Sequence, residues 1–284
     1  MFDFMIRLGQ LVLPLFIFAT MANVGLTQDP KRIVRYWRDW PFYLKMLVAN
    51  FLAAPAAMWL LLRIRPLPVD YKAGLAVFSL CAGAPFLIKL TATSEHDLAL
   101  GAATMMLLVI ATIAVVPLAL PVVMPELSVD GGAMAWTLAQ QLLLPMAAGA
   151  LLTYVLPDLS RRLQPWVARI GNMALYVVLV ATIIGYLPDM PTIIMSGALI
   201  IGLLFVLAAF GLGYLAGWGN DPLEDIGGLA TAQRNTAAAM LIAVSSFTDP
   251  TVFVLITLVN TIGIVVLIGI AKLLKGDNAR VAVI

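Results

Sequence analysis

Two positively charged residues, Lys89 and Arg234, stand inside long apolar stretches of the sequence. Lys89 belongs to the stretch SLCAGAPFLIKLT (79–91), and Arg234 belongs to GGLATAQRNTAAA (227–239). All 15 acidic residues fall in polar breaks or at the ends of apolar stretches, so neither cation has an obvious carboxylate partner. A charge at the centre of a bilayer costs at least about 2.5 kcal/mol, so the two residues predict an anionic ligand that offsets this cost.

Amide and hydroxyl side chains accompany the two cations and extend the predicted site. We expect a solute-binding site formed by Lys89, Arg234, Asn235, Gln233, Thr236, Pro85, Thr91 and Asn260. Asn260 is included because it follows the second stretch and would face the same cavity. Asn23, Asn50 and Asn172 also lie in apolar stretches, where asparagines join helices as often as they bind a ligand.

Each of these residues also has a purely structural interpretation. Lys89 would reach the membrane surface and pair with Glu95 or Asp97, six and eight residues onward. Arg234 lies deeper in its stretch and is less able to do so. Cys81 is expected to be a small packing residue, and His96 a residue of a loop.

Composition excludes several classes of function. The chain has one cysteine and one histidine, so it offers neither a disulfide, nor a Cys/His metal cluster, nor a catalytic triad. We therefore expect no enzyme activity, no metal and no cofactor. The net charge of +2 does not indicate a nucleic-acid partner.

The elements that must position these residues are membrane helices. Hydrophobic residues make up 62% of the 284 residues and charged residues only 11%, against about 25% in soluble domains. A helix needs about 20 mostly apolar residues to cross the hydrocarbon core. Nine such runs are present, at about 6–27, 43–62, 73–91, 98–124, 136–156, 166–187, 192–218, 223–245 and 251–274. The sequence predicts one all-α transmembrane domain over 1–284.

The third and eighth runs are interrupted. Gly83 and Pro85 break the third, because proline removes a backbone donor and clashes with the preceding turn. The eighth carries polar residues at its middle. Each run precedes the last span of its half, and interrupted helices in corresponding positions of two halves indicate a transporter binding site. We therefore predict two repeats, at about 1–125 and 133–275.

Basic residues predict the orientation in the membrane. An odd number of spans places the termini on opposite sides, and cytoplasmic loops are richer in Lys and Arg. With the C-terminus inside, the inner segments hold Lys31, Arg32, Arg35, Arg38, Arg161, Arg162, Arg169, Lys272, Lys275 and Arg280. The outer segments hold only Arg7, Arg63, Arg65 and Lys72. We expect an extracellular N-terminus and a cytoplasmic C-terminus, with oligomeric state left open.

These residues resemble those of the bile acid:sodium symporter family, over most of the chain. The resemblance rests on VGLT at 24–27, on the segment 81–85 and on the small residues after Asn235. It implies a bacterial inner-membrane transporter of the nine-helix type. Two inverted repeats would contribute two broken helices, which cross at 85–89 and 231–235 in a core domain beside a panel domain. Family members mostly carry organic anions, including bile acids and small carboxylates, by alternating access.

The chain departs from the family at the sodium ligands. Sodium-coupled members place a Ser-Asn pair after the first crossing segment, where this chain has Leu87 and Ile88 followed by Lys89. At the second crossing segment they have an acid and a glutamine, where this chain has Ala230 and Arg234. Sodium needs oxygen ligands, as calcium does. We therefore hypothesise that the two cations replace two sodium ions, and that a desolvated Lys89 exchanges a proton.

The leading interpretation is a secondary or facilitative transporter of a small organic anion that does not use the usual sodium sites. A sodium symporter with rearranged ligands, including Gln233, remains an alternative. The related arsenite exporters carry their functional cysteine within the first crossing segment, whereas Cys81 precedes it. A membrane receptor that keeps the fold without transporting a solute is a third alternative.

Overall fold

The structure is a computed structural model that describes residues 2–28, 30–123, 130–188, 190–247 and 251–281. This part of the chain is helical and contains no strand. Seven helical segments within it are long and apolar enough to cross a membrane: Phe2–Thr27, Trp40–Leu61, Leu98–Val123, Gly131–Val155, Pro157–Gly185, Ala198–Ala216 and Thr251–Lys275. The all-α membrane fold is confirmed, and the count of nine spans stays a prediction.

The other two predicted spans each consist of two shorter helices. The third run forms α5 (Val69–Leu80) and α6 (Leu87–Thr93), and the eighth forms α13 (Asp221–Ala232) and α14 (Thr236–Ser246). The predicted interruptions at Gly83–Pro85 and at Gln233–Asn235 are thus confirmed.

The remaining elements complete the chain around these broken helices. They are α1 (Phe2–Thr27), α2 (Pro30–Tyr36), α3 (Trp40–Val48), η1 (Ala49–Ala53), α4 (Ala54–Leu61), α7 (Leu98–Val123), α8 (Gly131–Leu138), η2 (Ala139–Leu143), α9 (Leu144–Val155), α10 (Pro157–Gly185), α11 (Met190–Ser196), α12 (Ala198–Ala216) and α15 (Thr251–Val281). The π-helical turns η1 and η2 lie inside otherwise continuous helices.

Several helix ends differ from the predicted runs. The fifth run starts earlier, at Gly131, because Asp130 caps α8 by accepting hydrogen bonds from the backbone of Gly132 and Ala133. The sixth starts at Pro157, since proline suits the first turn of a helix. The predicted end at Met124 lies outside the described residues, as does the side chain of Arg280.

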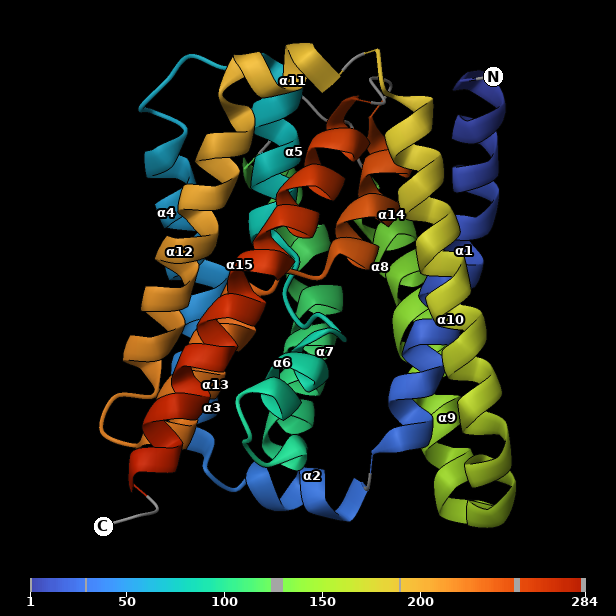
Figure 1. Ribbon diagram of the computed structural model, residues 1–284, viewed down its shortest axis with the longest axis vertical. Helices are drawn as coiled ribbons and strands as arrows, with labels where there is room; N and C mark the ends of the chain where they lie inside the picture. The colour runs from blue at the N-terminus through green and yellow to red at the C-terminus, as the bar shows by residue number, and fades with distance from the viewer. Residues whose placement is uncertain (1, 29, 124–129, 189, 248–250, 282–284) are drawn as a thin grey trace.

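The helices form two groups (Figure 1). One group consists of α1, α9 and α10, which pack against one another. The backbones of α1 and α9 are so close at Gly25 that a Cβ atom there would lie 2.0 Å from the carbonyl oxygen of Met146. The other group contains both broken helices with α3, α4, α7, α12 and α15. α1 begins at one end of the molecule and α15 finishes at the other.

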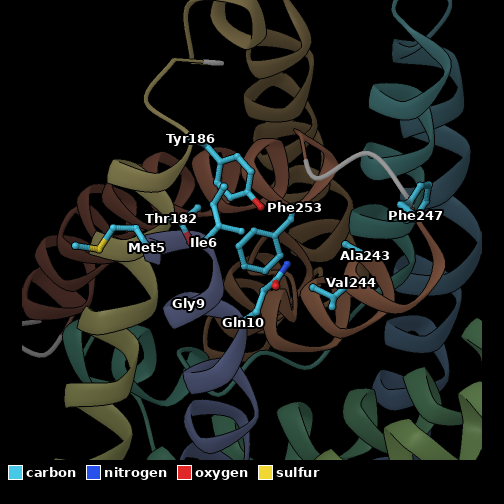
Figure 2. Close-up of a pocket in the computed structure, with 10 residues that line it drawn as sticks. All are labelled: Met5, Ile6, Gly9, Gln10, Thr182, Tyr186, Ala243, Val244, Phe247 and Phe253. Atoms are coloured by element: carbon cyan, nitrogen blue, oxygen red, sulfur yellow. The ribbon is translucent and has the colours of Figure 1, made fainter. Parts of the chain in front are cut away.

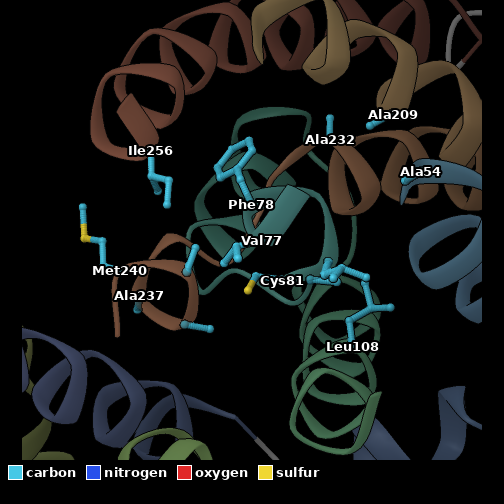
Figure 3. Close-up of a cluster of buried hydrophobic side chains, with 14 of the residues drawn as sticks. Ala54, Val77, Phe78, Cys81, Leu108, Ala209, Ala232, Ala237, Met240 and Ile256 are labelled. Carbon is cyan, nitrogen blue, oxygen red and sulfur yellow. The ribbon is translucent and has the colours of Figure 1, made fainter. Parts of the chain in front are cut away.

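The larger group is packed around the interrupted part of the third run (Figure 3). Cys81 is fully buried there, which confirms its expected packing role. The surrounding side chains come from seven helices and include Ala54, Val77, Phe78, Leu108, Ala209, Ala232, Ala237, Met240 and Ile256. Both broken helices are therefore held in a close-packed apolar environment.

Candidate functional site at the helix crossing

The two broken helices meet where both are unwound. Asn235 connects them, because its backbone N–H donates to the carbonyl oxygen of Cys81 (2.9 Å) and its Nδ2 donates to that of Gly83 (3.0 Å). Its Oδ1 also accepts from the N–H of Ala238 (3.1 Å) and so caps α14. The crossing is confirmed, but in the third span the contact falls at Cys81 and Gly83 rather than at 85–89.

The unwound backbone at the crossing is satisfied by the protein itself. The hydroxyl group of Thr112 on α7 accepts from the N–H of Ala82 and donates to its carbonyl oxygen, both at 3.0 Å. Gly83 has a φ of +79°, and a Cβ atom there would lie 2.4 Å from the backbone nitrogen of Val109. Only glycine fits this position. Irregular backbone at membrane depth requires such internal partners.

Arg234 lies at the centre of the crossing and is completely buried, with 0% exposure. Its guanidinium group donates to three oxygens: Nη1 to Asn50 Oδ1 (2.7 Å), and Nη2 to the carbonyl oxygens of Ser79 (2.7 Å) and Asn50 (3.3 Å). It also lies over the ring of Phe205, 5.4 Å from the centroid. Its Nε has no hydrogen-bond partner among the residues that the structure describes.

Two of the three oxygens around Arg234 are backbone carbonyl oxygens, one at the end of a helix and one in a π-helical turn, and the third is the side-chain oxygen of Asn50. Ser79 lies in the last turn of α5, where carbonyl groups lack partners within the helix and carry partial negative charge. Asn50 lies in the π-helical turn η1, and such turns are frequent at functional sites. Its Nδ2 donates to Thr231 Oγ1 (3.0 Å) of α13. Asn50 therefore contacts both Arg234 and α13, the helix that precedes Arg234. The guanidinium group is thus held by neutral oxygens.

The other predicted residues of the eighth and ninth spans lie beside Arg234. Gln233 is buried, and its Nε2 donates to Asn260 Oδ1 (3.2 Å) on α15. Thr236 is buried at the start of α14, with its hydroxyl 3.4 Å from the carbonyl oxygen of Arg234. Asn260 is half-buried. The structure therefore brings Arg234, Gln233, Asn235, Thr236 and Asn260 together.

The predicted residues of the third span lie further along the chain. Pro85 is half-buried in the turn before α6. The hydroxyl group of Thr91 donates to the carbonyl oxygen of Leu87 (2.8 Å), and its side chain faces Gly101 of α7. Lys89 is exposed, and its ammonium group lies over the ring of Phe86, 5.5 Å from the centroid. The structure places none of the three in contact with Arg234.

Lys89 does not pair with the two acidic residues that follow α6. Glu95 forms an ion pair with Lys275 of α15 (2.6 Å), and Asp97 pairs with Arg32 of α2 (3.1 Å). The alternative pairing with Glu95 or Asp97 is therefore wrong. That Lys89 exchanges a proton stays a prediction.

The Asp97 pair also involves Tyr36 of α2. The hydroxyl group of Tyr36 donates to Asp97 Oδ2 (2.5 Å), and this bond lowers the pKa of Asp97 below its ordinary value. The N–H of Ala99 and the charge of Arg32 act in the same direction, against partial burial. Burial, followed by the same hydrogen bond, raises the pKa of Tyr36. This cluster anchors α2 beneath α7.

A small cavity separates the two groups of helices near the end where α1 begins (Figure 2). Its volume is about 90 Å³. Its lining comes from α1, α10, α14 and α15 and from residues just after them: Met5, Ile6, Gly9, Gln10, Thr182, Tyr186, Ala243, Val244, Phe247 and Phe253. No lining residue is charged. Ala243 is eight residues after Asn235, which corresponds to about 12 Å along α14 from the crossing.

Two of the positions that the family resemblance assigns to sodium ligands carry no side-chain oxygen. Leu87 and Ala230 are buried, with 1% exposure each, and neither side chain has a polar atom. Arg234 brings a positive charge to the same crossing. Among the described residues, no three His, Cys, Asp or Glu side chains are grouped as metal ligands.

In the described part of the chain, seven apolar helices and two broken helices that cross at a buried polar site define a multi-pass membrane protein of the transporter type. The model of the sodium bile acid symporter family matches residues 14–188, more than half of the 284-residue chain. The chain belongs to this family. The match includes the first broken helix and ends before the second. Comparison with curated proteins finds no match.

Proposed function

We propose that this protein carries a small organic anion across the membrane by alternating access, without sodium at the crossing of its broken helices. The observation that carries the proposal is the contact of the Arg234 guanidinium group with three protein oxygens. In this arrangement a covalently attached cation provides the positive charge that a bound ion otherwise provides. We further propose that the N-terminus is extracellular and the C-terminus cytoplasmic.

The charge of Arg234 supports an anionic solute. A guanidinium group stays protonated in proteins, and no acidic residue of the described chain lies within ion-pair distance of it. Its positive potential at the crossing favours a negative charge nearby. In this conformation Arg234 is sealed from solvent, so direct contact with the solute would require a rearrangement. Its predicted role as a direct ligand stays a prediction.

Lys89 is the second cation of the proposal. Its ammonium group is exposed beside Phe86 and forms no ion pair in the described structure. We propose that it attracts the anion, while Arg234 holds the crossing together. The uncharged cavity between the helix groups suits the organic part of the solute, with Gln10, Thr182 and Tyr186 as its polar contacts.

The proposal is tested by the thermal stability of the purified protein with a panel of monocarboxylates and dicarboxylates, each as its sodium and its choline salt. A ligand that binds only the folded state stabilises it by RT ln(1 + [L]/Kd), about 2.7 kcal/mol at a hundredfold excess over Kd. We expect at least one anion to raise Tm equally in both salts. The variant Lys89→Gln should lose at least half of this rise.

The exposed Lys45, on α3, provides a matched control, and Lys45→Gln should keep the full rise. A rise in Tm that requires sodium would contradict the sodium-independent mechanism and favour a symporter with rearranged ligands. If no anion of the panel raises Tm, the proposed substrate class is wrong.

A further inference from the structure

Three consecutive residues after α6 each bond to a different element. Glu95 pairs with Lys275 of α15 (2.6 Å), His96 Nε2 lies 2.8 Å from Asp225 Oδ2 of α13, and Asp97 pairs with Arg32 of α2 (3.1 Å). The turn that carries them thus joins the end of one broken helix to the start of the other. Of these three pairs, only His96–Asp225 is buried, with side-chain exposures of 6% and 9%.

The turn has a conformation that directs His96 inward. The N–H of Glu95 donates to the carbonyl oxygen of Ala92 (3.3 Å), and the N–H of His96 donates to that of Thr91 (3.1 Å). This is a Schellman motif, whose left-handed position is usually a glycine. Here Glu95 occupies it with a φ of +59°, at a cost of about 1–2 kcal/mol. The two backbone hydrogen bonds of the turn hold Glu95 in this strained conformation. His96 is the next residue.

Other charged groups around the pair already have partners or are exposed. On α13, Glu224 Oε1 accepts from the N–H of Gly219 (2.7 Å), and Asp221 lies exposed in the first turn. Tyr214 of α12 bonds to Glu224. Among the side chains that the structure describes on α3, α6 and α15, the other titratable residues are the exposed Lys45, Lys89 and Lys272 and the buried Tyr43; α7 has none. In the described structure, His96 is therefore the one basic residue that pairs with an ionised Asp225.

We propose that the buried His96–Asp225 pair is a proton-binding site that sets how firmly the two broken helices are held together at this end of the molecule. Protonated His96 donates a charge-assisted hydrogen bond, which is roughly twice as strong as a neutral one. When the proton leaves, Asp225 is left as a buried carboxylate without an opposite charge, which is unfavourable. The site thus responds to pH on the side that Lys and Arg predict to be cytoplasmic.

Neither residue belongs to the crossing, so the proposal goes beyond the proposed transport of an anion and is tested without a substrate. His96 is the only histidine of the chain, so histidine-selective ¹⁵N labelling of protein purified with a histidine-free tag gives the signals of one imidazole. We expect this imidazole to change from imidazolium to neutral between pH 5.5 and 8.5. In Asp225→Asn the midpoint should move to lower pH, because the imidazolium loses its charge-assisted hydrogen bond.

Thermal stability provides the second measurement. His96→Gln keeps a hydrogen-bond donor for Asp225 but cannot take up a proton. We expect the Tm difference between wild type and His96→Gln to be about 3 °C larger at pH 6 than at pH 8.5. A difference that is the same at both pH values, together with an unchanged midpoint in Asp225→Asn, would overturn the proposal.

A wild-type imidazole that keeps one protonation state from pH 5.5 to 8.5 would overturn it too, even if both variants failed to fold. Once an anion is identified, uptake by wild type should change at least twofold when the pH on the side of His96 changes from 6 to 8, and uptake by His96→Gln should not. If no anion is found, the NMR and Tm results still decide whether the His96–Asp225 proposal is correct. The two proposals can therefore be refuted independently.

Discussion

Replacing Asn50 by alanine tests whether the guanidinium group of Arg234 is held as the structure shows. The substitution removes the 2.7 Å hydrogen bond from Arg234 Nη1 and the 3.0 Å bond to Thr231 Oγ1. A hydrogen bond to a charged group contributes about 1.5–3 kcal/mol, and a neutral one about 0.5–1.5 kcal/mol. The carbonyl oxygen of residue 50 still accepts from Nη2. We therefore expect a loss of about 3 kcal/mol.

This loss corresponds to a fall in Tm of about 6–12 °C, at about 2–4 °C per kcal/mol. Cys81 reports the transition directly, because it is the only cysteine, is completely buried and lies at the crossing. A thiol-reactive dye should label it only when the crossing opens. Asn172→Ala is the matched control, since Asn172 is an exposed asparagine on α10, and its Tm should stay within about 1 °C of wild type.

A double-mutant cycle separates the Arg234 contact from general packing. In an Arg234→Met background the acceptor Oδ1 of Asn50 has lost its charged donor, so Asn50→Ala should cost about 1.5–3 kcal/mol less than in wild type. An equal cost in both backgrounds, or a fall in Tm no larger than that of Asn172→Ala, would refute the described geometry.

Three further predictions concern the crossing and the α2 cluster. Gly83→Ala should prevent formation of a monodisperse folded protein in size-exclusion chromatography, because its Cβ meets the backbone of α7. Gly219→Ala, also at a positive φ but with open space around it, should cost only about 1–2 kcal/mol. The double variant Ala230→Glu with Arg234→Gln restores side-chain oxygens in place of the fixed cation. Its Tm should therefore rise with sodium relative to choline, whereas that of wild type should not. Asp97 has a lowered pKa, so its stabilising contribution is present above the ordinary aspartate value of about 3.9 and is lost as pH falls through the lowered value. The Tm difference between wild type and Asp97→Asn should accordingly shrink below about pH 4.

The broken helices were predictable because their causes are local. Proline and glycine interrupt a helix through their own backbone geometry, so Gly83 and Pro85 locate the break at 81–86. The polar stretch around Arg234 is visible because its neighbours are apolar. The position of the contact was less predictable: the crossing involves Cys81 and Gly83, and only the three-dimensional packing places Asn235 beside them.

The partners of the charged residues were not predictable from their spacing. Asn50 and Arg234 are 184 residues apart, and nothing in the sequence distinguishes Asn50 from the other asparagines in apolar runs. The carbonyl oxygen of Ser79 could not be predicted as a partner of Arg234, because every residue has a backbone carbonyl oxygen. His96 was expected in a loop and does lie in one, but its burial against Asp225 depends on the turn at Glu95. The sequence feature that could have singled out His96 is that it is the only histidine of the chain and follows an interrupted helix.

The most direct test of the central claim is uptake of the stabilising anion, in radiolabelled form, into proteoliposomes that contain the purified protein. Initial rates are compared with sodium outside and with choline outside, against liposomes without protein. We predict the same protein-dependent rate in both salts. A rate that requires sodium would contradict it, because Arg234 would then not replace the coupling ion at the crossing.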